Sequence, residues 1–201
     1  MKLAPISSKH SNPALNSRKP RVAAEFVSLT SGGTVKPTAI LITTSFFAED
    51  KYSAIHQHVV QYARQGGVVV FCALFSSMIS PPKMTEMWRS QWNLPWKSAG
   101  YDRWTFELNP ERTHRLQNIV SLPGAYSMKA VSLSGLSTES SVYAVRAQAK
   151  ESPAAFKPYG AGYVGYLGDV NAEVESTAVI LGMCGCWSNL GYAKLISLRF
   201  C

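Results

Sequence analysis

The sequence predicts an α/β fold with a mostly parallel central sheet, on the strength of three observations in residues 36–77. Residues 38–44 and 68–75 are two apolar, β-branched runs of the kind that form buried strands. Between them, apolar side chains recur at helical spacing, at Tyr52, Ile55, Val59, Tyr62 and Ala63. Gly66 and Gly67 then supply the left-handed conformation that ends many helices. Together these segments predict a βαβ unit, whose two strands are parallel.

The segments around this unit are expected to extend the sheet and to cover it. Residues 23–29 have the composition of a first strand, and Pro81 opens a helix after the βαβ unit. Residues 100–158 contain short strand candidates separated by Pro, Gly and Ser, which predicts a β-rich excursion from the parallel core. Residues 154–167 predict a hairpin, and residues 174–183 predict a helix that packs back on the sheet.

Charge and composition divide the chain into three parts. The net charge is +8, and most of the positive excess lies in residues 1–22, a Ser/Pro/Asn-containing leader that is expected to be disordered. Residues 23–186 form the predicted α/β domain. Residues 187–201 are a C-terminal tail, for which a terminal strand and a loose tail are both open. The basic leader also leaves nucleic-acid contact and organelle targeting open as alternatives.

The sequence argues against secreted and membrane-spanning classes. The leader lacks the apolar core of a secretory signal, and no later run approaches the roughly 20 apolar residues that a membrane helix needs. The cysteines, Cys72, Cys184, Cys186 and Cys201, do not have the pattern of a disulfide framework. We therefore expect an intracellular protein, in the cytoplasm, with no membrane contact.

No metal or cofactor is expected from the spacing of the ligand-type side chains. Cys184 and Cys186 have a single residue between them, unlike the usual zinc or redox spacing. His56 and His58 are two apart on the predicted helix, so they point in different directions and cannot form a two-histidine metal face. Surface or packing roles are expected for both histidines.

Two groups of residues resemble a known family. Residues 153–156 and 160–168 are similar to the closing hairpin of the class I glutamine amidotransferase-like superfamily, including its ThuA-like branch. Together with residues 126–130 and 168–173, they make the chain resemble a group of fungal proteins of that architecture. The resemblance extends from about residue 24 to 184. It implies a flavodoxin-like three-layer sandwich.

The same resemblance implies a catalytic triad that this chain does not complete. In active members a cysteine lies in a Gly-x-Cys-x-Gly turn after a strand, and a distant histidine and glutamate assist it. Cys72 follows the corresponding strand, but Val70 and Leu74 replace the two glycines. Residues 168–173 contain no histidine where the family has one. Without a base, Cys72 is expected to be a buried, unreactive thiol.

Polar side chains near two predicted strand ends are the other candidate site. Asp169, Asn171 and Glu173 follow the hairpin, and Ser76 and Ser77 follow the second βαβ strand. The carboxyl ends of parallel strands form the usual ligand crevice of such sheets. Asp169 and Glu173 can supply an acid/base pair or oxygen ligands. Alternatively, Asp169 or Asn171 caps the following helix, and the serines form caps or turns.

An aromatic cluster has two interpretations. It consists of Trp88, Trp92, Trp96, Tyr101 and Trp104. The helical spacing of its first members favours a place in the core, whereas an exposed cluster would be a platform for a partner, a ring-shaped ligand or single-stranded nucleic acid.

These observations predict a noncatalytic amidotransferase-like domain that acts as an interaction or small-ligand-binding module. The partner is expected to be a protein or a small molecule. The first alternative is a hydrolase or transferase whose site gathers Asp169, Asn171, Glu173 and Ser76 at the strand ends. The second is a nucleic-acid binder that uses the basic N-terminal arm.

Overall fold

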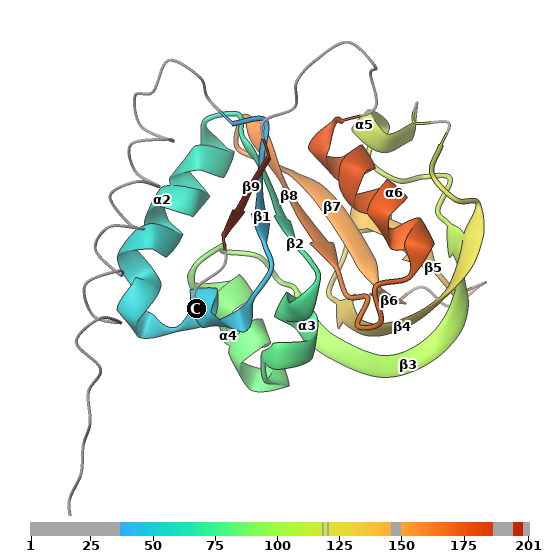
Figure 1. Ribbon diagram of the computed structural model, residues 1–201, viewed down its shortest axis with the longest axis horizontal. Coiled ribbons are helices and arrows are strands. Elements are labelled where there is room, and N and C mark those ends of the chain that lie inside the picture. The colour runs from blue at the N-terminus through green and yellow to red at the C-terminus, as the bar shows by residue number, and fades with distance from the viewer. Residues whose placement is uncertain (1–36, 118, 120, 146–149, 187–194, 199–201) are drawn as a thin grey trace, which may run out of the picture.

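A computed structural model describes residues 37–117, 119, 121–145, 150–186 and 195–198 (Figure 1). The predicted leader, residues 1–22, and the predicted first strand, residues 23–29, lie outside the described residues. No helix in the described part is long and apolar enough to cross a membrane.

The described elements alternate at first between strands and helices and then become mainly strands. The strands are β1 (Ala39–Ile42), β2 (Val68–Phe71), β3 (Lys97–Leu108), β4 (Ala125–Ser134), β5 (Ser141–Ala144), β6 (Glu151–Ser152), β7 (Ala154–Tyr159), β8 (Gly162–Leu167) and β9 (Leu195–Leu198). The α-helices are α2 (Ser53–Arg64), α3 (Leu74–Met78), α4 (Pro81–Ser90), α5 (His114–Gln117) and α6 (Val174–Cys184). The 3-10 helices are η1 (Ser45–Ala48), η2 (Asp50–Tyr52) and η3 (Thr138–Ser140).

All the described strands belong to one mixed sheet, with the order β6-β4-β3-β5-β7-β8-β2-β1-β9. The pairs β1–β2, β1–β9 and β2–β8 are parallel. The pairs β3–β4, β3–β5, β4–β6, β5–β7 and β7–β8 are antiparallel. Antiparallel pairing therefore predominates, and the prediction of a mostly parallel, flavodoxin-like three-layer sandwich is wrong.

This error comes from residues 100–158, which the sequence analysis predicted to be a β-rich excursion outside the parallel sheet. Residues 97–159 contribute β3 to β7, which are integral strands of the sheet rather than an addition to it. The described strands of this segment are not joined as βαβ units: β4 returns antiparallel beside β3, and β5 pairs antiparallel with both β3 and β7. The parallel pairs are β1–β2, which α2 connects, and β1–β9 and β2–β8, which each contain one of those two strands.

The predicted βαβ unit itself is confirmed. β1 and β2 are parallel neighbours in a register from Ala39 opposite Val68 to Ile42 opposite Phe71, and α2 connects them. Gly66, with φ +100°, follows the helix, and the Gly67 amide donates to the Tyr62 carbonyl oxygen at 3.0 Å. The glycines thus end α2 in the left-handed way that their position predicted.

The predicted hairpin and the last predicted helix are also present. β7 and β8 pair antiparallel through a turn at Gly160, which has φ +62°. The predicted helix over residues 174–183 is α6. β9, which lies within residues 187–201, pairs in parallel with β1 at an edge of the sheet.

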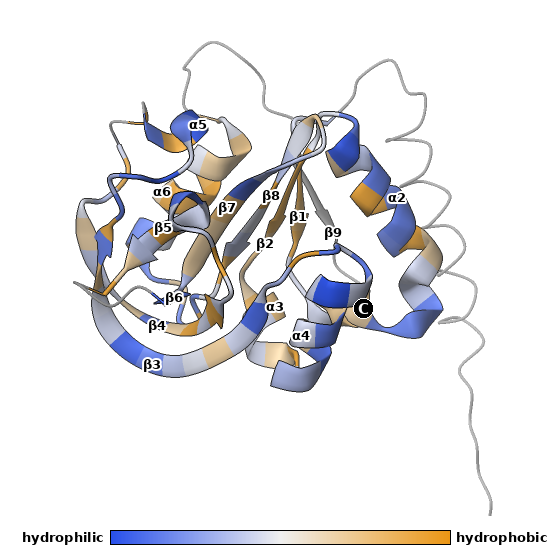
Figure 2. Ribbon diagram, turned by 180° about the vertical axis from the view of Figure 1, so that it is seen from behind, coloured by the Kyte–Doolittle hydropathy of each residue, from blue (hydrophilic) through white to orange (hydrophobic). Residues whose placement is uncertain are grey.

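Two apolar cores lie on the two faces of the parallel strands. The side chains of β2 alternate between them: Val69 and Phe71 belong to the core under α2 and α4, whereas Val68 and Val70 belong to the core under α6. Figure 1 shows α2 and α6 on opposite sides of these strands. In Figure 2, β1 and β2 are hydrophobic, whereas α2 carries both hydrophobic and hydrophilic residues, as expected for a helix that covers a sheet.

The aromatic cluster of the sequence divides between the core and the surface. Trp88, Trp92 and Trp96 are buried under the sheet. Tyr101 and Trp104 are 54% and 55% exposed, on the long curved strand β3 (Figure 1). A register shift between Ser98 and Tyr101 separates the two groups. The core interpretation therefore holds for the three buried tryptophans only.

Candidate functional site

The carboxyl ends of β2 and β8 lie side by side, because these two strands are parallel neighbours. β2 continues through Cys72 and Ala73 into α3, and β8 continues through Gly168 into Asp169. The buried Ser76 hydroxyl on α3 donates to the Gly168 carbonyl oxygen at 3.3 Å. The structure thus brings Ser76 to the β8 end, from a position inside α3.

Cys72 is enclosed at the end of β2. The side chain is 2% exposed, and its backbone amide donates to the Ile42 carbonyl oxygen at 3.0 Å. Burial raises the pKa of its thiol to about 12, and no cationic neighbour acts against that rise. Because the thiolate is the reactive form, Cys72 is a poor nucleophile at neutral pH.

The strained position of this turn belongs to the next residue, Ala73. Its backbone has φ 56° and ψ −126°, a conformation that glycine adopts readily and other residues rarely do. A sharp, strained turn between a strand and a helix is where many hydrolases expose the side chain of their nucleophile. Here that side chain is an exposed methyl group.

The resemblance placed the candidate nucleophile at Cys72, in a turn whose two family glycines are replaced here by Val70 and Leu74. The turn forms without them, because Ala73 itself adopts the positive φ. The apolar run of residues 68–75 concealed the position, since β2 ends at Phe71 and α3 begins at Leu74. Nothing in the sequence marks Ala73 as the residue that takes this conformation.

Asp169 organises the loop before α6. Its carboxyl group is 5% exposed; Oδ1 accepts a hydrogen bond from the Asn171 amide at 2.9 Å, and Oδ2 accepts one from the Glu173 amide at 2.7 Å. The loop also requires φ 56° at Ala172. Both oxygens of Asp169 are therefore engaged by the backbone of its own loop.

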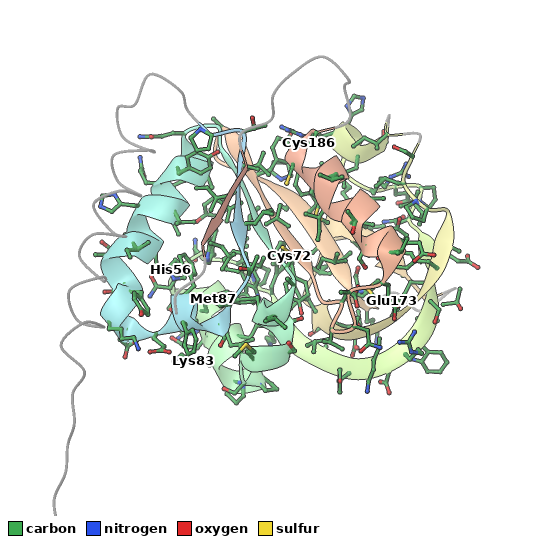
Figure 3. The ribbon with its side chains drawn as sticks, in the orientation of Figure 1. His56, Cys72, Lys83, Met87, Glu173 and Cys186 are labelled. Carbon is green, nitrogen blue, oxygen red and sulfur yellow. The ribbon has the colours of Figure 1, made fainter. Side chains whose placement is uncertain are left out.

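Glu173 makes an ion pair across the sheet. Its Oε1 lies 2.7 Å from Nη2 of Arg103 on β3, whose other terminal nitrogen donates to the Ser127 hydroxyl at 3.3 Å. This pair connects the start of α6 to β3. Figure 3 shows Glu173 near the curve of β3 and far from Cys72.

The remaining predicted residues do not join this group. Asn171 is exposed, and the Ser77 hydroxyl donates to the Leu74 carbonyl oxygen within α3, at 3.2 Å. Within the described residues, no group of three or more His, Cys, Asp or Glu side chains is arranged to hold a metal ion. The polar groups at these strand ends thus make hydrogen bonds and an ion pair within the fold, so few of them are free to act as an acid or a base.

A second candidate site, which sequence reasoning did not find, is a cavity of about 100 Å³ between the start of α2 and one side of α4. Its lining includes His56, Lys83 and Met87, which Figure 3 labels, and further residues of η1, η2 and the two helices. His56 is 2% exposed, and its ring lies between those of Phe47, at 4.2 Å, and Trp92, at 5.9 Å. Its Nε2 atom is fully buried, with no hydrogen-bond partner among the residues that the structure describes.

Burial also determines the charge state of His56. It lowers the pKa of the imidazole to about 4, so the ring is neutral at pH 7. The sequence showed His56 only as a polar residue two positions from His58 on a helix. Its neighbours, Phe47 and Trp92, come from η1 and from beyond the end of α4, so the local pattern contained no sign of this site.

A larger cavity, of about 350 Å³, lies around α5 and the start of β8. The Arg115 guanidinium in its wall lies 4.7 Å from the centre of the Tyr163 ring, which stacks on Phe156 at 5.0 Å. Arg112 donates hydrogen bonds to the carbonyl oxygens of Asn109, Leu116 and Gln117. Arg112 therefore supports the wall of this cavity, and Arg115 is the cation that packs against an aromatic face.

Comparisons with known proteins leave the family open. No protein-family model matches the chain, and no curated protein matches its sequence. One similar solved structure is a beta-galactosidase from Bacillus circulans sp. alkalophilus, with a TM-score of 0.45 and 12% identity over 89% of this chain and 28% of that one. Another is Gan42B, a GH42 beta-galactosidase, with a TM-score of 0.37 and 10% identity over 83% of this chain and 25% of that one.

The chain thus spans little more than a quarter of the length of these two structures. At such TM-scores the similarity supports no argument about architecture or activity. The functional argument therefore rests on the described residues themselves.

Proposed function

We propose that this chain is a noncatalytic domain that acts as a small-ligand-binding or interaction module inside the cell, in the cytoplasm. The observation that carries the proposal is Ala73 at the strained turn after β2. A nucleophile at this position would be exposed and next to the end of β8, but alanine has no group that can attack a substrate. The proposal includes kinship with the amidotransferase-like superfamily, limited to β1, β2, β8 and this turn.

The chemistry of the neighbouring residues supports the noncatalytic part. The Cys72 thiol is held protonated by burial, and the two oxygens of Asp169 accept backbone hydrogen bonds. A general base needs a free lone pair within reach of the proton that it removes. Neither residue offers a free and reactive group.

The two cavities support the binding part. One is lined in part by the neutral His56 ring, and the other has a guanidinium packed on an aromatic ring. Pockets that bind small ligands combine enclosed space with a few polar groups that fix orientation. Exposed Tyr101, with the Lys129 ammonium 4.9 Å from its ring centre, supports the interaction alternative.

The test of the noncatalytic part is an assay of ammonia release from glutamine by the purified full-length protein. No release above that of a Cys72→Ser variant is expected. In parallel, labelling with iodoacetamide at neutral pH, located by peptide mass spectrometry, should leave Cys72 unmodified.

A matched variant gives the labelling experiment a positive control. The double substitution Cys72→Ser and Ala73→Cys moves the thiol by one residue, from the interior to the exposed turn. This thiol should be alkylated readily, because its side chain faces solvent. Ammonia release that disappears in Cys72→Ser, or rapid alkylation of native Cys72, would refute the proposal.

A further inference from the structure

The end of α6 brings two cysteine side chains together. Cys184 is the last residue of the helix, and Gly185 follows it in the left-handed conformation, with φ 73° and ψ 27°. The amides of Gly185 and Cys186 donate to the carbonyl oxygens of Gly182 and Leu181, both at 3.0 Å, and these hydrogen bonds fix the turn. Across the turn, the thiols of Cys184 and Cys186 share a hydrogen bond.

The two thiols differ in their access to solvent. Cys184 is completely buried in the core under α6, whereas Cys186 is only half-buried and packs against that core. Figure 3 shows Cys186 at the end of α6, near α5. A reagent from solution therefore reaches Cys186 first and finds Cys184 directly behind it.

A cation lies at the same turn. A Cβ atom added to Gly185 would lie 2.9 Å from Nη2 of Arg115, whose guanidinium also lies 4.7 Å from the centre of the Tyr163 ring. Burial raises the pKa of the Cys184 thiol, and the positive charge of Arg115 acts against that rise. Burial also raises the pKa of Cys186, and the hydrogen bond with Cys184 acts against it. Both influences favour the thiolate, which is the reactive form in disulfide exchange.

The backbone of this turn suits a disulfide. Disulfides join residues whose Cα atoms are about 4.4–6.8 Å apart. Residues two apart in a helix are separated by about 5.4 Å, and a left-handed residue between them gives the same separation, because its bend is the mirror image of the helical one. The ring that closes between Cys184 and Cys186 is small and strained, which makes its disulfide easy to reduce. The single intervening residue is unusual for a redox pair, but the turn places the two thiols in contact.

We propose that Cys184 and Cys186 are a redox site, which gives two electrons to a small disulfide of the glutathione type. The Cys186 thiolate attacks one sulfur of oxidised glutathione, bonds to it and releases the first glutathione. The Cys184 thiolate then attacks the sulfur of Cys186 and releases the second. Two protein thiols and one glutathione disulfide become one protein disulfide and two glutathione thiols, which take up the two protons. This site goes beyond the binding function proposed above and does not rest on it.

The test equilibrates the full-length protein under nitrogen with glutathione buffers of increasing oxidised fraction and then blocks the remaining thiols with N-ethylmaleimide. Trypsin releases residues 151–194, because Pro158 protects Lys157 from cleavage; this peptide contains Cys184 and Cys186 but neither of the other two cysteines. Mass spectrometry should find the peptide unlabelled and two hydrogens lighter as the oxidised fraction rises. Dithiothreitol should restore both labels.

Single substitutions separate the attacking thiol from the thiol that closes the ring. Cys184→Ser leaves Cys186 without a partner, so oxidation should stop at a mixed disulfide with one glutathione. Cys186→Ser leaves only the buried Cys184, which should remain a free thiol. Cys72→Ser is the matched control, and it should form the disulfide as the unaltered chain does. Far-UV circular dichroism checks that each variant is folded.

Three results with the unaltered chain would overturn the inference. They are a peptide with two labels at the most oxidising ratio, a glutathione mixed disulfide as the main product at Cys186, and a disulfide that joins either residue to Cys72. Each of them leaves the noncatalytic proposal standing. That proposal fails separately, through Cys72-dependent ammonia release.

Discussion

Burial decides the chemistry of the two single residues on which the site depends. Cys72 and His56 are both 2% exposed, but burial has a different effect on the chemistry of each side chain. The buried thiol is more firmly protonated, whereas the buried imidazole is more firmly neutral. Cys72 therefore loses reactivity, and His56 stays uncharged at pH values well above 4.

His56 should make folding stability depend on pH. Its pKa is lowered to about 4 in the folded protein, against 6.5 in the unfolded chain, so the unfolded chain takes up a proton first as the pH falls. The stability that neutral His56 provides is complete above pH 6.5 and is lost between pH 6.5 and 4, at up to about 1.4 kcal/mol per pH unit. Urea unfolding at pH 7, 6 and 5 measures this slope.

The control for this prediction is a pair of variants on one helix. His56→Gln should remove most of the slope between pH 6.5 and 5, whereas His58→Gln, at an exposed position, should retain it. An unchanged slope in His56→Gln would show that other groups cause the pH dependence.

Asp169→Asn should destabilise the protein by about 1–2 kcal/mol. The amide keeps one acceptor but turns an NH₂ group toward one of the two backbone amides that Asp169 now binds. Thermal unfolding measures the loss, and the exposed Asn171→Ala is the control, with little change expected. Unchanged stability would favour the hydrolase or transferase alternative, in which Asp169 acts on a substrate.

At the scale of elements, the turn after β2 is the feature on which the noncatalytic proposal rests. Helix α2 and the β7–β8 hairpin were predictable, because the spacing before Gly66 and the hairpin glycines reflect interactions between residues a few positions apart in the sequence. Only the end of β3 was predictable, where Trp104, Phe106 and Leu108 alternate with polar residues; most of the strand is exposed, so its start at Lys97 has no such signal. Its length and curvature arise from pairing with β4, which the local sequence does not specify.

Ala73→Gly should stabilise the protein by up to about 1 kcal/mol. Glycine relieves the strain of φ 56°, typically 1–3 kcal/mol, and this gain exceeds the entropy that glycine loses on folding. The same replacement at Ala54, an exposed position in α2, should destabilise by about 1 kcal/mol. The free energies of unfolding in urea provide the comparison, and the same sign for both variants would contradict the strain at Ala73.

At the scale of the whole molecule, strand β2 joins the two apolar cores. Phe71 contacts Trp88 and Trp92 on one face, whereas Val70 and Val179 of α6 belong to the core on the other. The candidate sites depend on this arrangement, since the turn after β2 lies at its end and the His56 cavity lies beside the Trp92 core. Sequence reasoning identified both strands of the βαβ unit but not the contacts that bring η1 and α4 to His56.

The two cores should therefore unfold together. Val179→Ala, on the α6 side, should lower stability by about 2 kcal/mol through the methyl groups that it removes. Near-UV circular dichroism, which reports on the buried tryptophans of the other face, should shift by the same amount as far-UV circular dichroism. Two separate transitions would show that the faces are independent.

The long strand β3 has a consequence for the behaviour of the protein at high concentration. β5 pairs with only its last two residues, and no other described strand occupies that side of it. Helix α4 covers the start of this edge, where the Ser98 backbone amide donates to the Thr85 hydroxyl at 3.1 Å; the part of the edge that stays open can recruit the same edge of another molecule and start aggregation. Asp102 and Arg103 lie between the exposed Tyr101 and Trp104 in the sequence. A neighbouring chain that paired here would have to strip water from Asp102 and from the part of Arg103 that its ion pair with Glu173 leaves exposed. Attempts to improve expression or crystallisation should leave these two charges in place.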